Sequence, residues 1–144
     1  MKTTDNIHAT CVAINGCGVL IIGKSGLGKS DLALRIINNK GAVLVSDDRT
    51  DINVENNKIY ASSPNTIKGM LEVRGIGIIN LDSCNQAEVK LVINLVEDMA
   101  KIERMPAEKF YCLKDVKIPM IDLYSFEVSA VYKVVIKLKA LLEK

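Results

Sequence analysis

The segment from Gly23 to Ser30 constrains this chain most, because it fits the pattern G-x-x-x-x-G-K-[ST]. It follows the apolar run Cys17–Ile22 and precedes Lys29–Asn39, where apolar residues recur on one helical face. A strand, a glycine-rich turn and a helix in this order let backbone N–H groups converge on phosphate oxygens at the positive end of the helix dipole. We therefore predict a phosphate-binding loop (P-loop, residues 23–30) in an α/β domain.

Two side chains of the P-loop have expected roles. Lys29 should reach the β- and γ-phosphates of a nucleotide, and the Ser30 hydroxyl should bind Mg²⁺. The residues expected to bind the nucleotide are Gly23, Lys24, Ser25, Gly26, Leu27, Gly28, Lys29 and Ser30.

Missing motifs narrow the class of phosphate chemistry. Neither Asn39-Lys40 nor Asn57-Lys58 continues into the N-K-x-D guanine reader of GTPases. The H-R-D and D-F-G motifs of eukaryotic-type protein kinases are absent from the sequence. Small-metabolite kinases with a P-loop usually carry an arginine-rich lid, whereas the arginines here are dispersed: Arg35, Arg49, Arg74 and Arg104.

Composition limits the partners and the compartment. The chain has 144 residues, of which 49% are hydrophobic, enough for the core of one domain spanning 1–144. A net charge of +2 and 4% aromatic residues argue against nucleic acid as a partner. No apolar run is long enough to cross a membrane, and the 4 cysteines are isolated in apolar surroundings. We expect a cytoplasmic protein with reduced, buried thiols.

A β-hairpin should precede the P-loop. The runs Ala9–Ile14 and Cys17–Ile22 flank Asn15-Gly16, the strongest two-residue hairpin signal. If Ile14 pairs with Cys17, continued antiparallel register puts His8 opposite Gly23. The strand that leads into the P-loop then has an antiparallel neighbour, so the sheet should be mixed.

The rest of the chain is rich in strands and ends in a helix. Residues Val128, Val131, Val135, Leu138 and Leu142 recur at three- and four-residue steps, which predicts an amphipathic helix whose apolar stripe packs on the core. The other expected strands are Ala42–Val45, Asp51–Val54, Lys58–Ala61, Leu71–Val73, Ile76–Leu81, Val89–Val96 and one or two within Tyr111–Ile121.

The pair Asp47-Asp48 follows the strand expected at Ala42–Val45, a usual position for a carboxylate near Mg²⁺. Neighbouring side chains of an extended chain point to opposite faces, so only one carboxylate can face a reacting phosphate unless the backbone turns. The same alternation puts Glu72 and Arg74 on one face, so that the two side chains project together, and a salt bridge between them is one possibility.

These features together resemble the catalytic domain of the HPr kinase/phosphorylase family. The resemblance rests on His8, on the P-loop followed by Asp31, and on two segments. The first segment reads Val43-Leu44-Val45-Ser46-Asp47-Asp48-Arg49, and the second reads Leu71-Glu72-Val73-Arg74-Gly75-Ile76-Gly77-Ile78-Ile79-Asn80. The resemblance implies a single P-loop domain with a mixed sheet, similar to the phosphoenolpyruvate carboxykinase-like fold.

The resemblance also implies roles for individual residues. Asp47 would be the catalytic base that deprotonates the substrate serine, with Asp48 in support, and Ser30 and Glu72 would bind Mg²⁺. His8 would lie beside the reacting phosphate, although a surface histidine is the alternative. Arg74 belongs to a segment tied to dephosphorylation. Arg104 matches an arginine that neutralises the transferring charge, or it is a surface arginine.

The function that the resemblance implies is ATP- and Mg²⁺-dependent phosphorylation of a serine on the phosphocarrier HPr or its nitrogen-system homologue, with the reverse reaction. The family forms hexamers. The chain departs from the longer members at Ile121–Glu127, where their glycine-rich stretch is replaced. Two alternatives are therefore an ATP-binding regulatory module with weak catalysis and a small-metabolite kinase.

Overall fold

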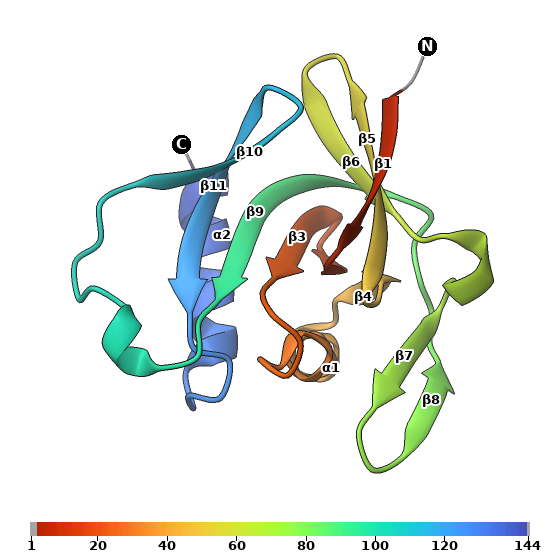
Figure 1. The fold of residues 1–144 in the computed structure, drawn as a ribbon, viewed down its shortest axis with the longest axis horizontal. Coiled ribbons are helices and arrows are strands. Elements are labelled where there is room, and N and C mark those ends of the chain that lie inside the picture. The colour runs from red at the N-terminus through yellow and green to blue at the C-terminus, as the bar shows by residue number, and fades with distance from the viewer. Residues whose placement is uncertain (1–2, 144) are drawn as a thin grey trace.

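The computed structural model describes the backbone of residues 3–143 and, within that range, the side chains of residues 5–38 and 41–143. Its elements form a mixed sheet with two α-helices and a separate hairpin (Figure 1). The helices are α1 (Lys29–Lys40) and α2 (Ala130–Leu142). The strands are β1 (Thr3–His8), β2 (Thr10–Ile14), β3 (Cys17–Ile22), β4 (Val43–Ser46), β5 (Arg49–Glu55), β6 (Lys58–Ser62), β7 (Met70–Val73), β8 (Gly77–Asn80), β9 (Ala87–Leu95), β10 (Lys109–Leu113) and β11 (Val116–Leu123).

The main sheet branches at β9. Its path runs β1-β5-β6-β9-β3-β2-β4, and β11 also pairs with β9 and carries β10 at its far edge. The first residues of β9 pair antiparallel with β6, whereas its last residues pair parallel with β11. Because β3 also pairs parallel with β9, the sheet is mixed, as predicted.

Two-residue turns close three hairpins. Asn15 and Gly16, between β2 and β3, have φ of 50° and 83°, the left-handed geometry that this hairpin turn requires. Asn56-Asn57 and Lys114-Asp115 adopt positive φ in the same way between their strands. The hairpin predicted at Asn15-Gly16 is confirmed, with Ile14 paired to Cys17.

The predicted position of His8 opposite Gly23 is wrong. The β2–β3 ladder ends at the pair Thr10 and Ile21, and His8 lies on β1, where it pairs with Arg49 of β5. The strand β1 was not predicted, because its residues are mostly polar and lack the alternation of a half-buried strand.

Both helices pack on one face of the sheet. Leu32 and Ile36 of α1 share a buried cluster with Val134 of α2 and with Val19 and Leu91 of the sheet. A second cluster fills the other face of the curled sheet; its members include Cys11, Leu20, Val45, Ile52, Ile59, Val92 and Ile118. Gly41 ends α1 with φ of 67°, a left-handed cap that glycine adopts without strain.

The helix α2 buries a slightly different stripe from the predicted one. Its fully packed residues are Ala130, Val131, Val134 and Leu138. Val128 precedes the helix and is 96% exposed, and Leu142 is 51% exposed near its end. The four cysteines are free thiols, but the prediction that all are buried is wrong: only Cys11 is buried, Cys17 and Cys84 are partly exposed, and Cys112 is exposed.

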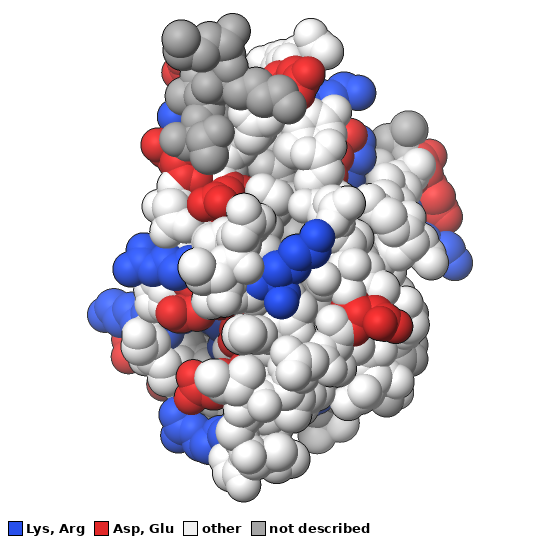
Figure 2. Space-filling model, turned by 90° about the vertical axis from the view of Figure 1, so that its right-hand side faces the viewer, with Lys and Arg blue, Asp and Glu red and all other residues white. Residues whose placement is uncertain are grey.

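The surface mixes charges of both signs. On the face shown in Figure 2, Lys and Arg side chains are interspersed with Asp and Glu over a mostly uncharged surface, in keeping with a net charge of +2. In the described part of the chain, no helix combines the length and the apolar character needed to cross a bilayer.

Candidate active site

Four strand ends meet at one edge of the sheet. The strands β3, β9 and β11 run parallel, and β4 runs the same way because two antiparallel pairings through β2 separate it from β3. The P-loop follows β3, Asp47 follows β4, and Tyr124 follows β11. Ligands of open α/β sheets bind at such an edge, so these three segments are the walls of a candidate site.

Lys29 closes the P-loop on itself. Its Nζ donates hydrogen bonds to the carbonyl oxygens of Gly23 at 2.7 Å and Lys24 at 3.1 Å, and the residue is only 7% exposed. Burial lowers the pKa of Lys29, against the opposing effect of the nearby Asp48 and Asp47 carboxylates. The ammonium group is thus held at the mouth of the loop, where incoming phosphate oxygens can replace the two carbonyls.

Asp47 is buried and hydrogen-bonded through both carboxylate oxygens. Its Oδ1 accepts from Ser30 Oγ at 2.5 Å and from Thr10 Oγ1 at 3.1 Å, and its Oδ2 accepts from the backbone N–H of Glu72 at 3.1 Å. The residue is 7% exposed. Asp47 therefore ties the start of α1 to β2 and to the hairpin β7–β8.

Asp48 turns the other way, into the open. Its φ of 66° is left-handed, and its backbone N–H donates to Thr10 Oγ1 at 3.2 Å. Its Oδ1 lies 2.8 Å from His8 Nε2, and both side chains are solvent-accessible. The backbone turn at Asp48 decides which of the two carboxylates faces solvent, which the sequence alone left open.

A cavity of about 330 Å³ gathers most of the predicted site residues. It is lined by His8, Ser25, Gly26, Gly28, Lys29, Ser30, Asp31, Leu34, Asp48, Glu72, Val73, Arg74 and Phe126. Asp47 is not among them, because it lies behind Ser30. Within the described part of the chain, no ion pair joins Glu72 to Arg74, and no three His, Cys, Asp or Glu side chains are grouped to hold a metal.

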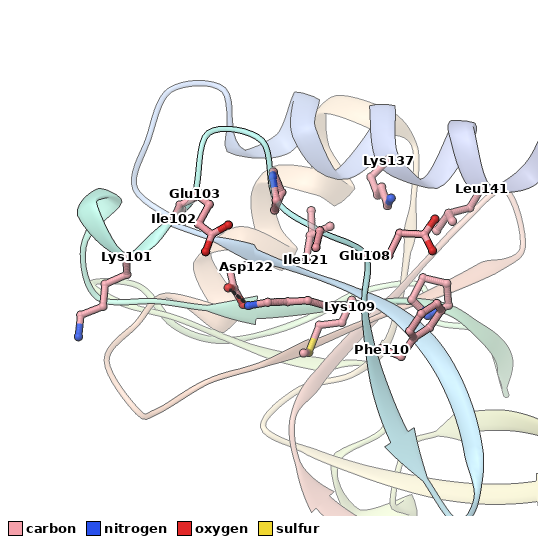
Figure 3. A pocket seen from close by; sticks show the side chains of 14 residues that line it. Lys101, Ile102, Glu103, Glu108, Lys109, Phe110, Ile121, Asp122, Lys137 and Leu141 are labelled. Carbon is pink, nitrogen blue, oxygen red and sulfur yellow. Dashed lines mark hydrogen bonds and ion pairs between the residues drawn. The ribbon is translucent and has the colours of Figure 1, made fainter.

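Arg104 is exposed and is not brought together with the residues that line the P-loop cavity. It follows Glu103 in the segment between β9 and β10, and Glu103 lines a second cavity of about 420 Å³ between that segment, the β10–β11 hairpin and α2 (Figure 3). Asp122, in this second cavity, accepts hydrogen bonds from Asn94 Nδ2 at 2.9 Å and from Lys109 Nζ. Arg104 does not line the P-loop cavity.

Two groups at the site were missed by the sequence analysis. The hydroxyl of Thr10, fully buried, bridges Oδ1 of Asp47 and the N–H of Asp48; a threonine opening an apolar strand gives no signal of this. Ser125 and Phe126 pack against Gly28 of the P-loop. They lie in the stretch where the sequence departs from its resemblance, which was the only clue to them.

Comparison with known proteins identifies a common family. A family model described as HPr Serine kinase C-terminal domain matches residues 1–140. The HPr kinase/phosphorylase of Mycoplasmopsis pulmonis is 34% identical over 128 residues, covering 81% of this chain and 41% of the relative. That of Thermoanaerobacter sp. (strain X514) is 38% identical over 128 residues, covering 81% and 42%. The chain thus spans about two-fifths of the length of these curated relatives.

A solved structure shares the fold. The Hpr(Ser) kinase/phosphatase from Coxiella burnetii superposes with a TM-score of 0.82 at 30% identity, covering 96% of this chain and 98% of that one. The predicted fold class, an α/β P-loop domain with a mixed sheet of the phosphoenolpyruvate carboxykinase-like kind, is confirmed.

Proposed function

Because the chain belongs to the HPr serine kinase C-terminal domain family, we propose that it phosphorylates HPr, or its nitrogen-system homologue, on a serine. The donor is ATP with Mg²⁺, the reverse phosphorylase reaction uses the same groups, and the protein acts in the cytoplasm as part of the phosphotransferase system. One observation carries the proposal: the P-loop lysine, an accessible carboxylate–histidine pair and the hairpin acid Glu72 line a single cavity.

The donor's phosphates bind to the P-loop. Lys29 and the loop N–H groups neutralise and orient the phosphate oxygens, which is the main protein contribution to phosphoryl transfer. Ser30 and Glu72 fit a magnesium site, since both offer oxygen and Ser30 keeps its lone pairs while donating its proton to Asp47. Mg²⁺ bound there would neutralise charge on the phosphates. Mg²⁺ takes many of its ligands from water and substrate, so two protein oxygens are a sufficient contribution from the chain.

The contacts favour Asp48 over Asp47 as the proton acceptor. Asp47 is buried, and its oxygens already accept three hydrogen bonds, which hold the carboxylate away from a substrate hydroxyl. Asp48 lines the cavity beside His8. We assign Asp48 the proton of the attacking serine hydroxyl and His8 the positioning of that carboxylate, while Asp47 holds Ser30. General-base help of this kind contributes about 10²- to 10⁴-fold to the rate.

In the forward reaction the serine oxygen bonds to the γ-phosphorus as the bond to the β-phosphate oxygen breaks, and Asp48 takes the serine proton. In reverse, Asp48 takes a proton from phosphate, whose oxygen bonds to the phosphorus of phosphoserine as the bond to the serine oxygen breaks. The products are pyrophosphate and a serine whose oxygen takes the proton back from Asp48. Arg74, which lines the cavity, is placed by this proposal beside the phosphates. The role of Arg104 stays a prediction, as does assembly into the hexamer expected from the resemblance.

The proposal is tested with the purified chain, ATP, Mg²⁺ and HPr, by mass spectrometry of the product. Phosphoserine on HPr, and none on an HPr whose acceptor serine is replaced by alanine, is the expected result. ATP binding without phosphoserine would instead identify an ATP-binding regulatory module. Phosphorylation of a small hydroxyl compound in place of HPr would identify a metabolite kinase.

A further inference from the structure

The connection between β11 and α2 is bound to the P-loop by a buried serine. Ser125 is fully buried, and its Oγ donates to the carbonyl oxygen of Gly28 at 3.3 Å. Arg35 of α1 donates to the carbonyl oxygen of Ser125 at 2.6 Å and to its Oγ at 2.8 Å. Asp31 in turn accepts from Arg35 Nε at 3.0 Å. Three hydrogen bonds thus fix this connection to the P-loop and α1, and a fourth, within α1, orients Arg35.

The next residue, Phe126, presents an aromatic ring at the mouth of the P-loop cavity. The ring is 53% exposed and lines the cavity together with Leu34 of α1. Gly28 approaches it so closely that a Cβ on Gly28 would lie 2.9 Å from Phe126 Cζ, and the φ of Gly28 is 95°. Tyr124 also makes an edge contact with the ring, with centroids 5.7 Å apart. Phe126 is therefore both held in place and half open to solvent.

The order of the strands in the sheet places Phe126 and Asp48 on opposite sides of the P-loop. From β3, which leads into the P-loop, the path to β4 and Asp48 crosses β2, and the path to β11 and Phe126 crosses β9 in the other direction. Figure 1 shows the connection after β11 on one side of the P-loop and the hairpin β7–β8 on the other. A polyphosphate lying across the P-loop would therefore have one end near Asp48 and the other near Phe126.

We propose that Phe126 is the nucleoside-binding wall of the site, with its ring stacked against the base of a nucleoside triphosphate. This inference rests on the proposed function, because the reacting phosphate must lie at Asp48 for the nucleoside to emerge at Phe126. An aromatic face accepts any base by stacking, so the wall selects a nucleoside-bearing donor over pyrophosphate without selecting a particular base. Ser125 and Arg35 position the ring and do not touch the ligand.

The test compares ligands with and without a nucleoside. Calorimetric titrations with Mg²⁺ measure the affinities of ATP, ADP, tripolyphosphate and pyrophosphate for the wild-type chain and for Phe126→Ala, Phe126→Tyr and Phe110→Ala. Phe110 is a matched control, because its ring is 46% exposed but lines the second cavity. We expect Phe126→Ala to weaken the affinities for ATP and ADP at least about fivefold. The affinities for tripolyphosphate and pyrophosphate should stay within about twofold of the wild-type values. Phe126→Tyr and Phe110→Ala should retain the wild-type affinities.

Three results would overturn the inference. Equal weakening of all four ligands by Phe126→Ala would mean that the ring only supports Gly28. Unchanged ATP and ADP affinities would mean that the nucleoside lies elsewhere, and a loss of transfer to HPr with those affinities unchanged would assign Phe126 to the protein substrate instead. Since binding is measured without HPr, a chain that shows the expected ligand pattern but makes no phosphoserine would refute the proposed function and not this inference.

Discussion

The hydroxyl of Ser30 donates a 2.5 Å hydrogen bond to Oδ1 of Asp47. This bond joins the first turn of α1 to the end of β4, two strands away from the P-loop strand in the sheet. It also separates two carboxylates that are adjacent in sequence, because Asp47 is committed to Ser30 while Asp48 faces His8 and the cavity.

Substitution of each aspartate by asparagine separates their roles. We expect Asp48→Asn to bind Mg·ATP within about twofold of wild type and to lose phosphoryl transfer by about 10² or more, since it lacks a proton acceptor. Asp47→Asn should weaken Mg²⁺-dependent ATP binding and lower the melting temperature, because it disturbs the buried contacts to Ser30 and Thr10. Calorimetry, melting curves and the phosphoserine assay measure these effects. The reverse pattern, with transfer lost only in Asp47→Asn at normal ATP affinity, would restore Asp47 as the base.

Replacing Thr10 by valine removes the hydroxyl that bridges the two aspartates and keeps the side-chain shape. Breaking buried hydrogen bonds of this kind costs about 1 kcal/mol of unfolding free energy. Thr50→Val is the matched control, since Thr50 is also fully buried and its hydroxyl donates to the carbonyl of Ala9 at 2.8 Å. Urea denaturation should show a similar loss for both variants. Only Thr10→Val should also lower kcat, by about tenfold; equal kcat values in the two variants would remove Thr10 from the site.

Replacing Lys29 by alanine should abolish tight ATP binding. The buried ammonium group of Lys29 is a positive charge held within the P-loop itself, so its removal should weaken the affinity for Mg·ATP by at least about tenfold. Lys24→Ala is the control within the same loop, because Lys24 is exposed and its side chain does not line the cavity. Calorimetric titration of both variants measures the difference. Wild-type affinity in Lys29→Ala would contradict the P-loop assignment.

The stability of the protein at acid pH should depend on the protonation of Asp122, which lines the second cavity. Desolvation alone would raise the pKa of Asp122, but the hydrogen bonds from Asn94 and Lys109 and the charge of Lys109 outweigh it and lower this pKa. The unfolded chain therefore binds the proton more readily, so the contribution of Asp122 to stability is present above its ordinary pKa of 3.8 and is lost as pH falls through the lowered value.

Melting temperatures of wild type and Asp122→Asn between about pH 5 and pH 2 check this expectation. The gap between the two proteins should be widest at pH 5 and should narrow toward pH 2. Asp115→Asn, at an exposed turn, should follow the wild-type curve. A gap that stays constant with pH would mean that the charge of Asp122 contributes nothing.

The parts of the fold that local sequence encodes were predictable. Asn15-Gly16 and Gly41 require left-handed backbone, and the P-loop glycines lie between an apolar strand and an amphipathic helix, so neighbours along the chain are sufficient to define them. The position of His8 was not predictable, since it depends on pairing with Arg49 in a strand made of polar residues.

Most of the residues predicted for the site do line the P-loop cavity, but their arrangement could not be predicted. Alternation along an extended chain predicted that only one of Asp47 and Asp48 would face a reacting phosphate unless the backbone turned. Which of them is buried depends on the left-handed turn at Asp48 and on Thr10. Phe126 could not have been assigned to the cavity from sequence, because only the parallel pairing of β11 with β9 brings it to the P-loop.

The branching of the sheet at β9 determines when the P-loop cavity can form during synthesis of the chain. The hairpin β2–β3 and α1 can form from adjacent residues as soon as they leave the ribosome, but β3 finds its parallel partner only after β9 has been made. The wall containing Phe126 requires β11 as well. The P-loop cavity is therefore completed late in synthesis, and a nascent chain truncated before β11 would expose the P-loop without the surface that closes it.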